Sequence, residues 1–393
     1  MKRKRIRKPK DHAPTLKSKH NVSIKVVGIG GGGGNVITRM GVDFIRGVDF
    51  IAVNTDAQDL EHCNAKQKIY IGRIATRGLG AGMNPELGRQ AAEENHADIA
   101  DALKGADMIF LTAGFGGGTG TGATPVIAEI AKETGALTVA VVTKPFSFEG
   151  STRIRIAEEG LLRLKDKVDT LLVIPNDRIF SVIDNNTPVV KAFEKIDDIL
   201  KSAVTGVTEV IASAGLVNVD FADVRAIMAE SGTAVVGTGV AEGKDRSIKA
   251  AALALNSPLL ETSIDGAKGV LFCIAGGRDL KMMEISEIAK LITENVDPGA
   301  KIIFGAYNDR KLKPGQIKVV LVATGFNGLS RRDDSLNLFG GSHVVKPILK
   351  ADEVGNPLGD DKKEEKENKE SLESNRKNDE IWDIPTFIRK KKR

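Results

Sequence analysis

Two short segments of this sequence are dense in glycine, and each follows a run of apolar residues. The first reads GIGGGGGN (Gly28–Asn35) and the second reads GFGGGTGTG (Gly114–Gly122). Glycines let the backbone approach a phosphate closely and turn its N–H groups toward the anion, and a helix that starts after the loop adds a favourable dipole. Thr119 and Thr121 add hydroxyls for phosphate oxygens or for a magnesium-bound water. The two segments together predict a nucleoside triphosphate site that grips the phosphate chain from two sides.

The first glycine segment alone fits two classes of nucleotide site. Gly28, Gly30 and Gly33 satisfy the G-x-G-x-x-G pattern of a dinucleotide-binding fold. Asp56 ends the next apolar run, where a ribose-binding acid would lie in an NAD-dependent dehydrogenase. A dehydrogenase has no use for the second segment, so the pair of segments favours a triphosphate. A P-loop NTPase would need a lysine directly after one loop, and because neither loop has it, backbone amides, a helix dipole and a metal ion must neutralise the charge.

A third segment, NVDFADVRAIM, carries Asn218, Asp220 and Asp223. If a helix begins at Asp220, the two carboxylates lie on one face near its N-terminus. The residues by themselves favour a structural role, with Asp220 as the helix cap and Asp223 as a favourable first-turn acid. The alternative is a pair of catalytic carboxylates.

Short apolar runs alternate with helix-like segments, which predicts βαβ units and a parallel sheet with its ligand at the carboxyl ends of the strands. A long amphipathic helix follows, with Thr187 as its cap, Pro188 at its first position and its end near Ala214. Predicted strands are Ile24–Ile29, Phe50–Val53, Met108–Ala113, Leu137–Thr143, Thr170–Ile174, Ala234–Val240, Gly269–Ala275, Lys301–Ala306 and Lys318–Thr324. Other predicted helices are Asn35–Met40, Pro85–Lys104, Gly122–Thr134, Arg153–Lys165, Arg246–Asn256 and Ile285–Val296.

The composition is that of a cytosolic globular protein with charged tails. Its 393 residues are 41% hydrophobic, which is enough for real cores, and the net charge of +5 is modest, so we expect no specific nucleic-acid partner. Cys63 and Cys273 stand far apart, which suits a reducing compartment. The sequence contains no run of 18 or more apolar residues, so we expect no membrane span. The basic N-terminus lacks the apolar stretch of a secretory signal.

Seven motifs in one order make the sequence resemble the tubulin/FtsZ family of GTPases. They are the two glycine segments and five further stretches: AVNTDAQ (Ala52–Gln58), GLGAGMNPE (Gly78–Glu86), TKPFSFEG (Thr143–Gly150), IPNDR (Ile174–Arg178) and GLVNVDFADVR (Gly215–Arg225). The resemblance runs from Ile24 to Gly325. It implies an α/β fold in which a Rossmann-like parallel-sheet GTPase domain and a smaller mixed α/β C-terminal domain are joined by a long central helix.

The resemblance also implies a role for each matching residue, with GTP, GDP and Mg²⁺ as the ligands and no side-chain metal site. Residues near the phosphates would be Gly31, Gly32, Gly33, Gly34 and Asn35 from the first segment, Ala81 and Gly82 at the γ-phosphate, and Gly118, Thr119 and Gly120 from the second segment. Residues around the nucleoside would be Glu149 and Arg153 at the ribose, and Asn176, Phe193 and Asp197 at the guanine, with Phe193 as the stacking platform.

For the third segment, the resemblance favours the catalytic alternative. In this family the loop lies at the far end of the long helix from the nucleotide and enters the nucleotide pocket of the next subunit. Asp220 and Asp223 would then orient a water or a cation for attack, with Asn218 positioning. The implied function is a GTP-dependent polymerising GTPase whose head-to-tail filaments scaffold the bacterial division ring, in the cytoplasm at mid-cell.

Resemblance and composition divide the chain into six expected parts. These are a disordered basic tail (1–20), a GTP-binding domain (21–187), the central helix (188–214), a C-terminal activation domain (215–328), a disordered charged linker (329–380) and a terminal peptide (381–393). Within the last part, DIPTFIR (Asp383–Arg389) resembles the partner-binding peptide of bacterial family members. We expect Trp382–Arg389 to bind membrane-tethering and regulatory cell-division proteins.

Overall fold

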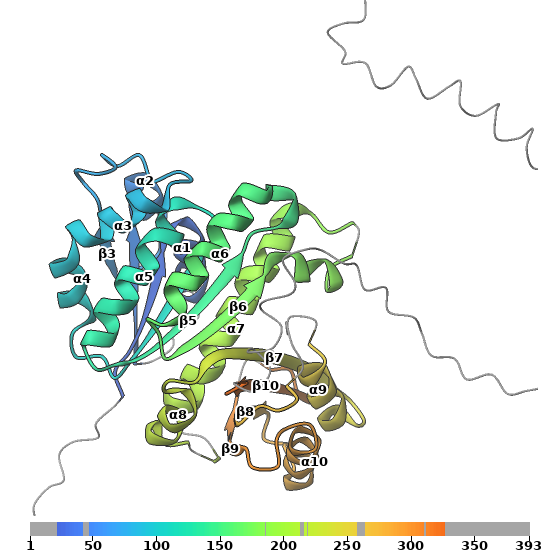
Figure 1. Ribbon diagram of the computed structural model, residues 1–393. Helices are drawn as coiled ribbons and strands as arrows, with labels where there is room; N and C mark the ends of the chain where they lie inside the picture. The colour runs from blue at the N-terminus through green and yellow to red at the C-terminus, as the bar shows by residue number, and fades with distance from the viewer. Residues whose placement is uncertain are drawn as a thin grey trace, which may run out of the picture. The chain divides into compact units, whose positions relative to one another are not determined.

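The computed structural model describes residues 22–41, 47–184, 186–212, 216–217, 219–257, 264–309 and 312–326. The predicted basic tail, charged linker and terminal peptide lie outside the described residues, as does Asn218. Within the described ranges, one sheet forms the centre of the molecule and helices cover both of its faces (Figure 1). No helix in these ranges combines the length and the apolarity that a membrane crossing requires.

The central sheet has ten strands in the order β3-β2-β1-β4-β5-β6-β7-β10-β8-β9. They are β1 (Ile24–Ile29), β2 (Val48–Asn54), β3 (Gln67–Tyr70), β4 (Met108–Gly114), β5 (Leu137–Lys144), β6 (Thr170–Pro175), β7 (Gly232–Glu242), β8 (Gly269–Gly276), β9 (Lys301–Asn308) and β10 (Gln316–Thr324). Strands from β3 to β7 are parallel, and β10 runs antiparallel to β7 and β8. The predicted α/β fold with a mainly parallel sheet is therefore confirmed.

Helices pack on both faces of the sheet. They are α1 (Gly30–Gly41), α2 (Ala57–His62), α3 (Pro85–Glu94), α4 (His96–Leu103), α5 (Gly118–Glu133), α6 (Ser151–Lys165), α7 (Val189–Ala212), α8 (Phe221–Met228), α9 (Arg246–Leu255) and α10 (Met282–Thr293), with short 3-10 turns η1 (Ser147–Glu149) and η2 (Asn176–Ser181). One apolar core joins α1, α7 and α8 to one face of the sheet. Two further cores fill the other face, under α3 to α6 and under α9 and α10.

Strand β4 shows why the central strands are continuous apolar runs. Met108 and Phe110 belong to the core under α1 and α7, whereas Ile109, Leu111 and Ala113 belong to the core under α3 to α6. Both faces of a parallel strand are buried when helices cover both sides of the sheet. The strand ends at the second glycine segment, so the core fixes the position of that segment.

Both glycine segments are more helical than the sequence predicts. The α1 helix begins at Gly30 rather than near Asn35, and α5 begins at Gly118 rather than at Gly122. Glycine has a low helix propensity, so tertiary packing decides these two starts. Close packing of α3 against α5 is one such contact, because a Cβ at Gly122 would lie 1.9 Å from the Pro85 carbonyl oxygen.

Other differences concern short or interrupted elements. The predicted helix Pro85–Lys104 is two helices, α3 and α4, with Asn95 between them. The Asn95 side chain accepts a hydrogen bond from the Gly72 N–H (2.9 Å), which ties the break to the chain that leaves β3. Strand β3 and helix α2 were not predicted, since segments of 4 and 6 residues are too short to show a periodicity.

Helix α7 contacts α1 and strands of both halves of the sheet. An apolar stripe from Ile196 to Val207 is buried, as the predicted amphipathic helix requires, whereas Phe193, one turn earlier, is 47% exposed. Toward the other end of α7, the Tyr307 hydroxyl of β9 donates a hydrogen bond to the Glu209 carboxylate (2.6 Å). The start of α7 is thus largely exposed, at Val189 and Val190, whereas its last turns are fixed to β9.

A buried cation fixes α9 to α10. The Arg246 guanidinium is paired with Asp279 (2.5 Å) and with Glu284 (2.7 Å), and its side chain is 8% exposed. The hydrogen bond from Arg246 holds the pKa of Glu284 below its usual value. This cluster stabilises the second half of the molecule, away from the site described next.

Candidate functional site

A cavity of about 490 Å³ lies where parallel strands end and helices begin. The last residues of β1 and β4, Ile29 and Gly114, line it, as does Thr143 near the end of β5. Its volume is within the range of small-molecule sites, and its place at the carboxyl ends of parallel strands is where such sheets bind ligands. Twelve of the fifteen residues predicted to bind the nucleotide line this one cavity.

From the first glycine segment, Gly31, Gly32 and Asn35 line the cavity. Gly33 and Gly34 do not. A Cβ at Gly33 would lie 2.4 Å from the Thr112 carbonyl oxygen, so this glycine lets α1 pack against the sheet. The first-turn N–H groups of a helix have no partner within their own helix, and α1 presents its first turn to the cavity.

The second glycine segment lines the cavity from a second direction with Gly118, Thr119 and Gly120. The Thr119 hydroxyl is hydrogen-bonded to the Thr55 hydroxyl (2.6 Å), which joins this segment to the end of β2. Gly120 has no room for a side chain, because a Cβ there would lie 2.3 Å from the Gly114 carbonyl oxygen. The N-termini of α1 and α5 therefore both border the cavity, as an anion site requires.

Thr121, the other hydroxyl of the second segment, is not a cavity residue. It is buried, and its Oγ1 accepts a hydrogen bond from the Gly116 N–H (2.9 Å). Asp56, the ribose acid of the dehydrogenase alternative, caps α2 by accepting hydrogen bonds from the N–H groups of Gln58 and Asp59. Both side chains stabilise local structure beside the site.

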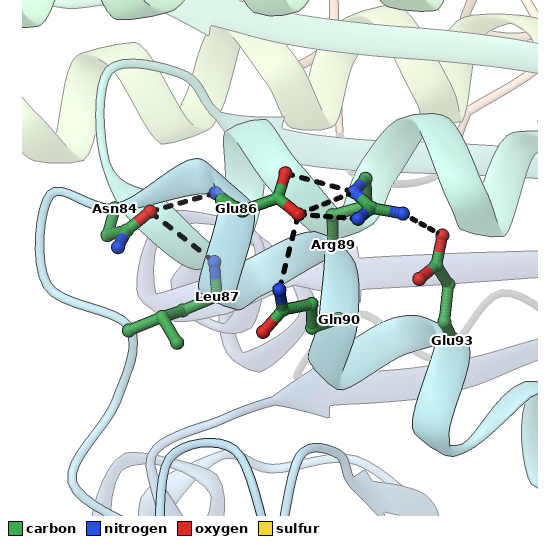
Figure 2. Close-up of polar contacts among 6 residues, drawn as sticks. All are labelled: Asn84, Glu86, Leu87, Arg89, Gln90 and Glu93. Atoms are coloured by element: carbon green, nitrogen blue, oxygen red, sulfur yellow. Dashed lines mark hydrogen bonds and ion pairs between the residues drawn. The ribbon is translucent and has the colours of Figure 1, made fainter.

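The loop before α3 reaches the second glycine segment. The Gly118 N–H donates a hydrogen bond to the Gly82 carbonyl oxygen (2.6 Å), and Gly82 lines the cavity with φ of 54°, a left-handed conformation that favours glycine. Ala81 is buried behind it. Figure 2 shows how the loop ends: the Asn84 side chain accepts hydrogen bonds from the Glu86 N–H (3.0 Å) and from the next residue, which fixes the start of α3.

Within α3, an ion-pair network stabilises the helix that carries this loop. The single N–H of Arg89 Nε is shared between the two oxygens of the Glu86 carboxylate (3.2 and 3.0 Å), and the guanidinium also pairs with Glu93 (Figure 2). Gln90 donates to the same Glu86 carboxylate (3.2 Å). Each bonded pair is three or four residues apart, about one turn of α3, where side chains on a helix face each other.

Glu149, Arg153 and Asn176 line the side of the cavity formed by η1, α6 and η2. The Arg153 guanidinium is paired with the Glu149 carboxylate, which also accepts a hydrogen bond from the Phe146 N–H (2.9 Å). The Asn176 Oδ1 is buried and has no hydrogen-bond partner among the described residues. A buried acceptor of this kind suits a ligand that carries an N–H donor, such as a nucleobase.

The first turns of α7 supply Phe193 and Asp197. The Phe193 ring packs edge-on against Phe146, with 5.6 Å between the ring centroids, and its exposed face suits stacking on a base. Asp197 forms an ion pair with Arg39 of α1, with 2.8 Å between Nε and Oδ2. Burial raises the pKa of the Asp197 carboxyl to about 6, and Arg39 opposes that shift.

Arg39 lines the cavity but was not predicted. The sequence contained one signal for it: Arg39 is four residues after Asn35, so both fall on one face once α1 is known to be helical. The contact with Asp197 joins residues more than 150 positions apart, and no local pattern shows it.

The acidic segment lies outside the cavity. Asp220 and Asp223 are exposed, at the start of α8, and neither lines the cavity. Asp220 occupies the cap position, but its side chain accepts no capping hydrogen bond from the described backbone of α8. The Asp220 carboxylate therefore does not cap α8 with a hydrogen bond, although the residues by themselves favoured that role.

Two helices run from the cavity toward the part of the molecule that carries these acids. Along α7, Asp197 and Ala212 are 15 residues apart, which is about 22 Å at 1.5 Å per residue. Along α5, Gly118 at the cavity and Glu133 are also 15 residues apart. Arg225 of α8 donates a hydrogen bond to the carbonyl oxygen of Gly135, just beyond that distal end (3.4 Å). The acids of one molecule are therefore too far away to touch a ligand in its own cavity.

Chemically, the cavity suits a base–ribose–phosphate ligand. Two helix N-termini border one end for the phosphates, and Phe193, Asp197 and Asn176 border the other end for the base. No group of three or more His, Cys, Asp or Glu side chains that could hold a metal ion occurs among the described residues.

Comparisons with known proteins give consistent results. Residues 23–184 match the Tubulin/FtsZ family, GTPase domain, and residues 232–327 match the FtsZ family, C-terminal domain. An FtsZ dimer structure from M. jannaschii is 48% identical with a TM-score of 0.75, covering 77% of this chain and 88% of that chain. A CetZ2 protofilament structure from Haloferax volcanii is 22% identical with a TM-score of 0.67, covering 77% of this chain and 92% of that chain, and shows the shared fold.

Proposed function

The chain belongs to the tubulin/FtsZ family of GTPases, and from that premise we propose that it polymerises head to tail and completes its GTPase site only between two subunits. The observation that carries this proposal is the separation of about 22 Å along α7 between Asp197 at the cavity and the end of the helix that precedes the acids. One subunit holds the nucleotide and its neighbour supplies the acids.

We assign the nucleotide contacts by the position of each residue around the cavity. Gly31, Gly32 and Asn35 face the phosphates from α1, and Gly118, Thr119 and Gly120 face them from α5, with Gly82 beside the γ-phosphate. Glu149 and Arg153 hold the ribose. Phe193 stacks on the guanine, and Asn176 and Asp197 accept hydrogen bonds from its N–H groups. Gly33 and Ala81 allow close packing of the elements that carry these contacts, whereas Gly34 has room for a Cβ, with 3.8 Å to the nearest side-chain atom, and takes no part in that packing.

We assign Asp220 and Asp223 to the orientation of the attacking water. Exposed carboxylates placed at a neighbour's γ-phosphate repel its charge at short range, so they act through a water or a cation. Asn218, which lies outside the described residues, would position that water. A Mg²⁺ ion that entered with the nucleotide would supply charge neutralisation at the phosphates.

A contact between the cavity of one subunit and the α8 end of another is heterologous. Such contacts generate open filaments when the rotation between subunits does not close a ring. The names of two similar structures describe a dimer and a GTPγS-bound protofilament, which agrees with this assembly. Leu216, next to the acids, is an exposed apolar side chain suited to burial in such a contact.

We further propose that the filament scaffolds the bacterial division ring in the cytoplasm at mid-cell. Its support is membership of the FtsZ family and the terminal sequence DIPTFIR. Trp382–Arg389 would bind the membrane-tethering and regulatory division proteins, since apolar residues after a charged linker are typical of short docking peptides. Residues 21–187 would form the GTP-binding domain, 188–214 the central helix and 215–328 the C-terminal activation domain.

A complementation experiment tests the shared site. Asn35→Asp places a nearly isosteric carboxylate against the phosphates, so it should abolish nucleotide binding, whereas Asp223→Ala should spare binding and abolish hydrolysis. In an equimolar mixture, half of the cavities and half of the acidic loops are intact. Random assembly then pairs them at about a quarter of the interfaces, and we expect up to about a quarter of wild-type phosphate release.

Each variant alone serves as the control, measured at the same total protein concentration with GTP. Recovery of activity in the mixture requires that one subunit's cavity meets another subunit's acids. A mixture no more active than the sum of its two components would contradict the proposal, as would full activity of Asp223→Ala.

A further inference from the structure

Arg39 and Asp197 form an ion pair inside the wall of the nucleotide cavity. Arg39 Nε lies 2.8 Å from Asp197 Oδ2, and both residues line the cavity. The Asp197 side chain is 15% exposed and the Arg39 side chain 35% exposed, so the carboxylate is largely shielded from water while the guanidinium keeps part of its solvent contact. The pair joins α1, which starts at the phosphate end of the cavity, to α7, which carries the base end.

The charges around Asp197 are unbalanced. Burial is the main cause that raises the pKa of its carboxyl, its neighbours Asp198 and Glu194 on α7 raise it further, and Arg39 is the opposing cation. The remaining charged side chains of the cavity wall, Glu149 and Arg153, are paired with each other. The net result is a pKa of about 6 for Asp197, close enough to neutrality for its charge to depend on Arg39.

We propose that Arg39 is a positioning residue for guanine recognition, which holds the Asp197 carboxylate in place and keeps it ionised at neutral pH. This inference rests on the proposed function, in which Asp197 accepts hydrogen bonds from the guanine. Guanine presents two adjacent donors on one edge, N1–H and the exocyclic amino group. An ionised carboxylate accepts from both, whereas a protonated carboxyl has one oxygen that donates.

Binding of GDP by the full chain, measured by calorimetry across pH, tests the proposal. GDP carries the same base and lacks the γ-phosphate, so assembly and turnover do not complicate the result. The pH dependence of the association constant reports ionisations of both the free protein and the free ligand, and the terminal phosphate of GDP itself titrates at about pH 6. The carboxyl is therefore read from the ratio of variant to wild-type affinity at each pH, in which the titration of GDP cancels. For the wild-type protein we expect the midpoint of the Asp197 titration near pH 6, from the pKa of about 6 of this carboxyl.

Arg39→Met removes the charge and keeps the bulk of the side chain. Loss of an adjacent cation raises a carboxyl pKa by about 1 to 3 units, and a rise of about 1.5 would leave only about a quarter of Asp197 ionised at pH 7. We therefore expect GDP to bind about fourfold more weakly than to wild type at pH 7, and to recover at about pH 8.5. Arg39→Lys should restore much of the affinity at pH 7.

Glu194→Gln is the matched control, because Glu194 is the second acidic neighbour of Arg39, at 3.8 Å. We expect it to leave the midpoint unchanged or slightly lower. A wild-type affinity and midpoint in Arg39→Met would overturn the proposal, and so would a loss of affinity by the same factor at every pH, which indicates a structural role only. Failure of the wild-type protein to bind GDP would instead overturn the proposed function.

Discussion

Replacement of Asp197 by Asn should make the nucleotide-free protein more stable and its guanine binding weaker. Burial raises the pKa of this carboxyl from its usual value of 3.8 to about 6. A carboxyl whose pKa is higher in the folded state than in the unfolded state binds its proton more tightly when folded. The stability that the protonated Asp197 carboxyl contributes to the folded state is fully present below about pH 3.8 and is lost as the pH rises through about 6. At neutral pH, the folded protein therefore holds a carboxylate that burial disfavours.

The size of the effect follows from that shift. About two pKa units correspond to about 3 kcal/mol at 1.36 kcal/mol per unit. The asparagine also loses the charge-assisted contact with Arg39, and residual solvent contact screens the penalty. We expect a net gain of about 1 to 2 kcal/mol at pH 7.5, which is a rise of a few degrees in Tm. At about pH 4.5 the wild-type carboxyl is mostly protonated, so the two proteins should differ less.

The same substitution should change which base binds. An asparagine offers one acceptor and one N–H₂ donor where the carboxylate offered two acceptors. Guanine then loses a charge-assisted hydrogen bond, for which we expect about a tenfold or larger loss of affinity. Xanthine carries a carbonyl in place of the exocyclic amino group, so xanthosine diphosphate should bind the variant better than it binds wild type.

Two measurements check this prediction: thermal unfolding of nucleotide-free protein at both pH values, and calorimetric titration with the two diphosphates. Asp198→Asn is the matched control, because Asp198 is the exposed neighbour on α7 and does not line the cavity. A variant at Asp197 that is less stable than wild type at neutral pH would refute the burial argument. One that binds GDP with wild-type affinity would refute the contact with guanine.

Three further predictions concern packing and buried polar contacts. Gly122→Ala should lower the free energy of unfolding by about 3 kcal/mol or more, because a Cβ there would meet a carbonyl oxygen at 1.9 Å. Gly34→Ala should be neutral or stabilising, because its Cβ would lie 3.8 Å from the nearest atom. Thermal unfolding of both variants checks this prediction. Arg246→Met should lower the free energy of unfolding by about 3 to 5 kcal/mol in denaturant titrations at pH 7. Arg246 lowers the pKa of Glu284, so the stability that this ion pair supplies is present above about pH 4.5 and is lost as the pH falls through the lower pKa of folded Glu284. The destabilisation caused by Arg246→Met should therefore be smaller in acid. Tyr307→Phe should cost about 1 to 3 kcal/mol, since it removes the hydrogen bond that fixes α7 to β9.

Much of the fold was predictable because its signals are local. Strand β1 has the predicted bounds Ile24–Ile29, and β4 and β5 end within one residue of the prediction. Buried parallel strands are short apolar runs that end in glycine or polar residues, and a sequence shows such runs directly. The prediction of a GTPase of this family is confirmed by the match of residues 23–184 and 232–327.

The helix starts within the glycine segments were not predictable, because their signals are not local. Gly30 and Gly118 begin helices although glycine disfavours them, because α1 and α5 are fixed by close contacts with β4 and α3. Such contacts join residues distant in sequence, and propensity does not record them.

The sequence by itself determined the chemistry of this protein: two glycine-rich helix starts for phosphates, a pair of acids in one short segment, and a family. Only the tertiary structure decided where these parts meet. It joined Arg39 to Asp197, set the ionisation of that carboxyl, and placed Asp220 and Asp223 beyond the reach of their own cavity. The physical reason is that residue types fix what a side chain can do, whereas burial, distance and charge environment arise only when separate elements pack together.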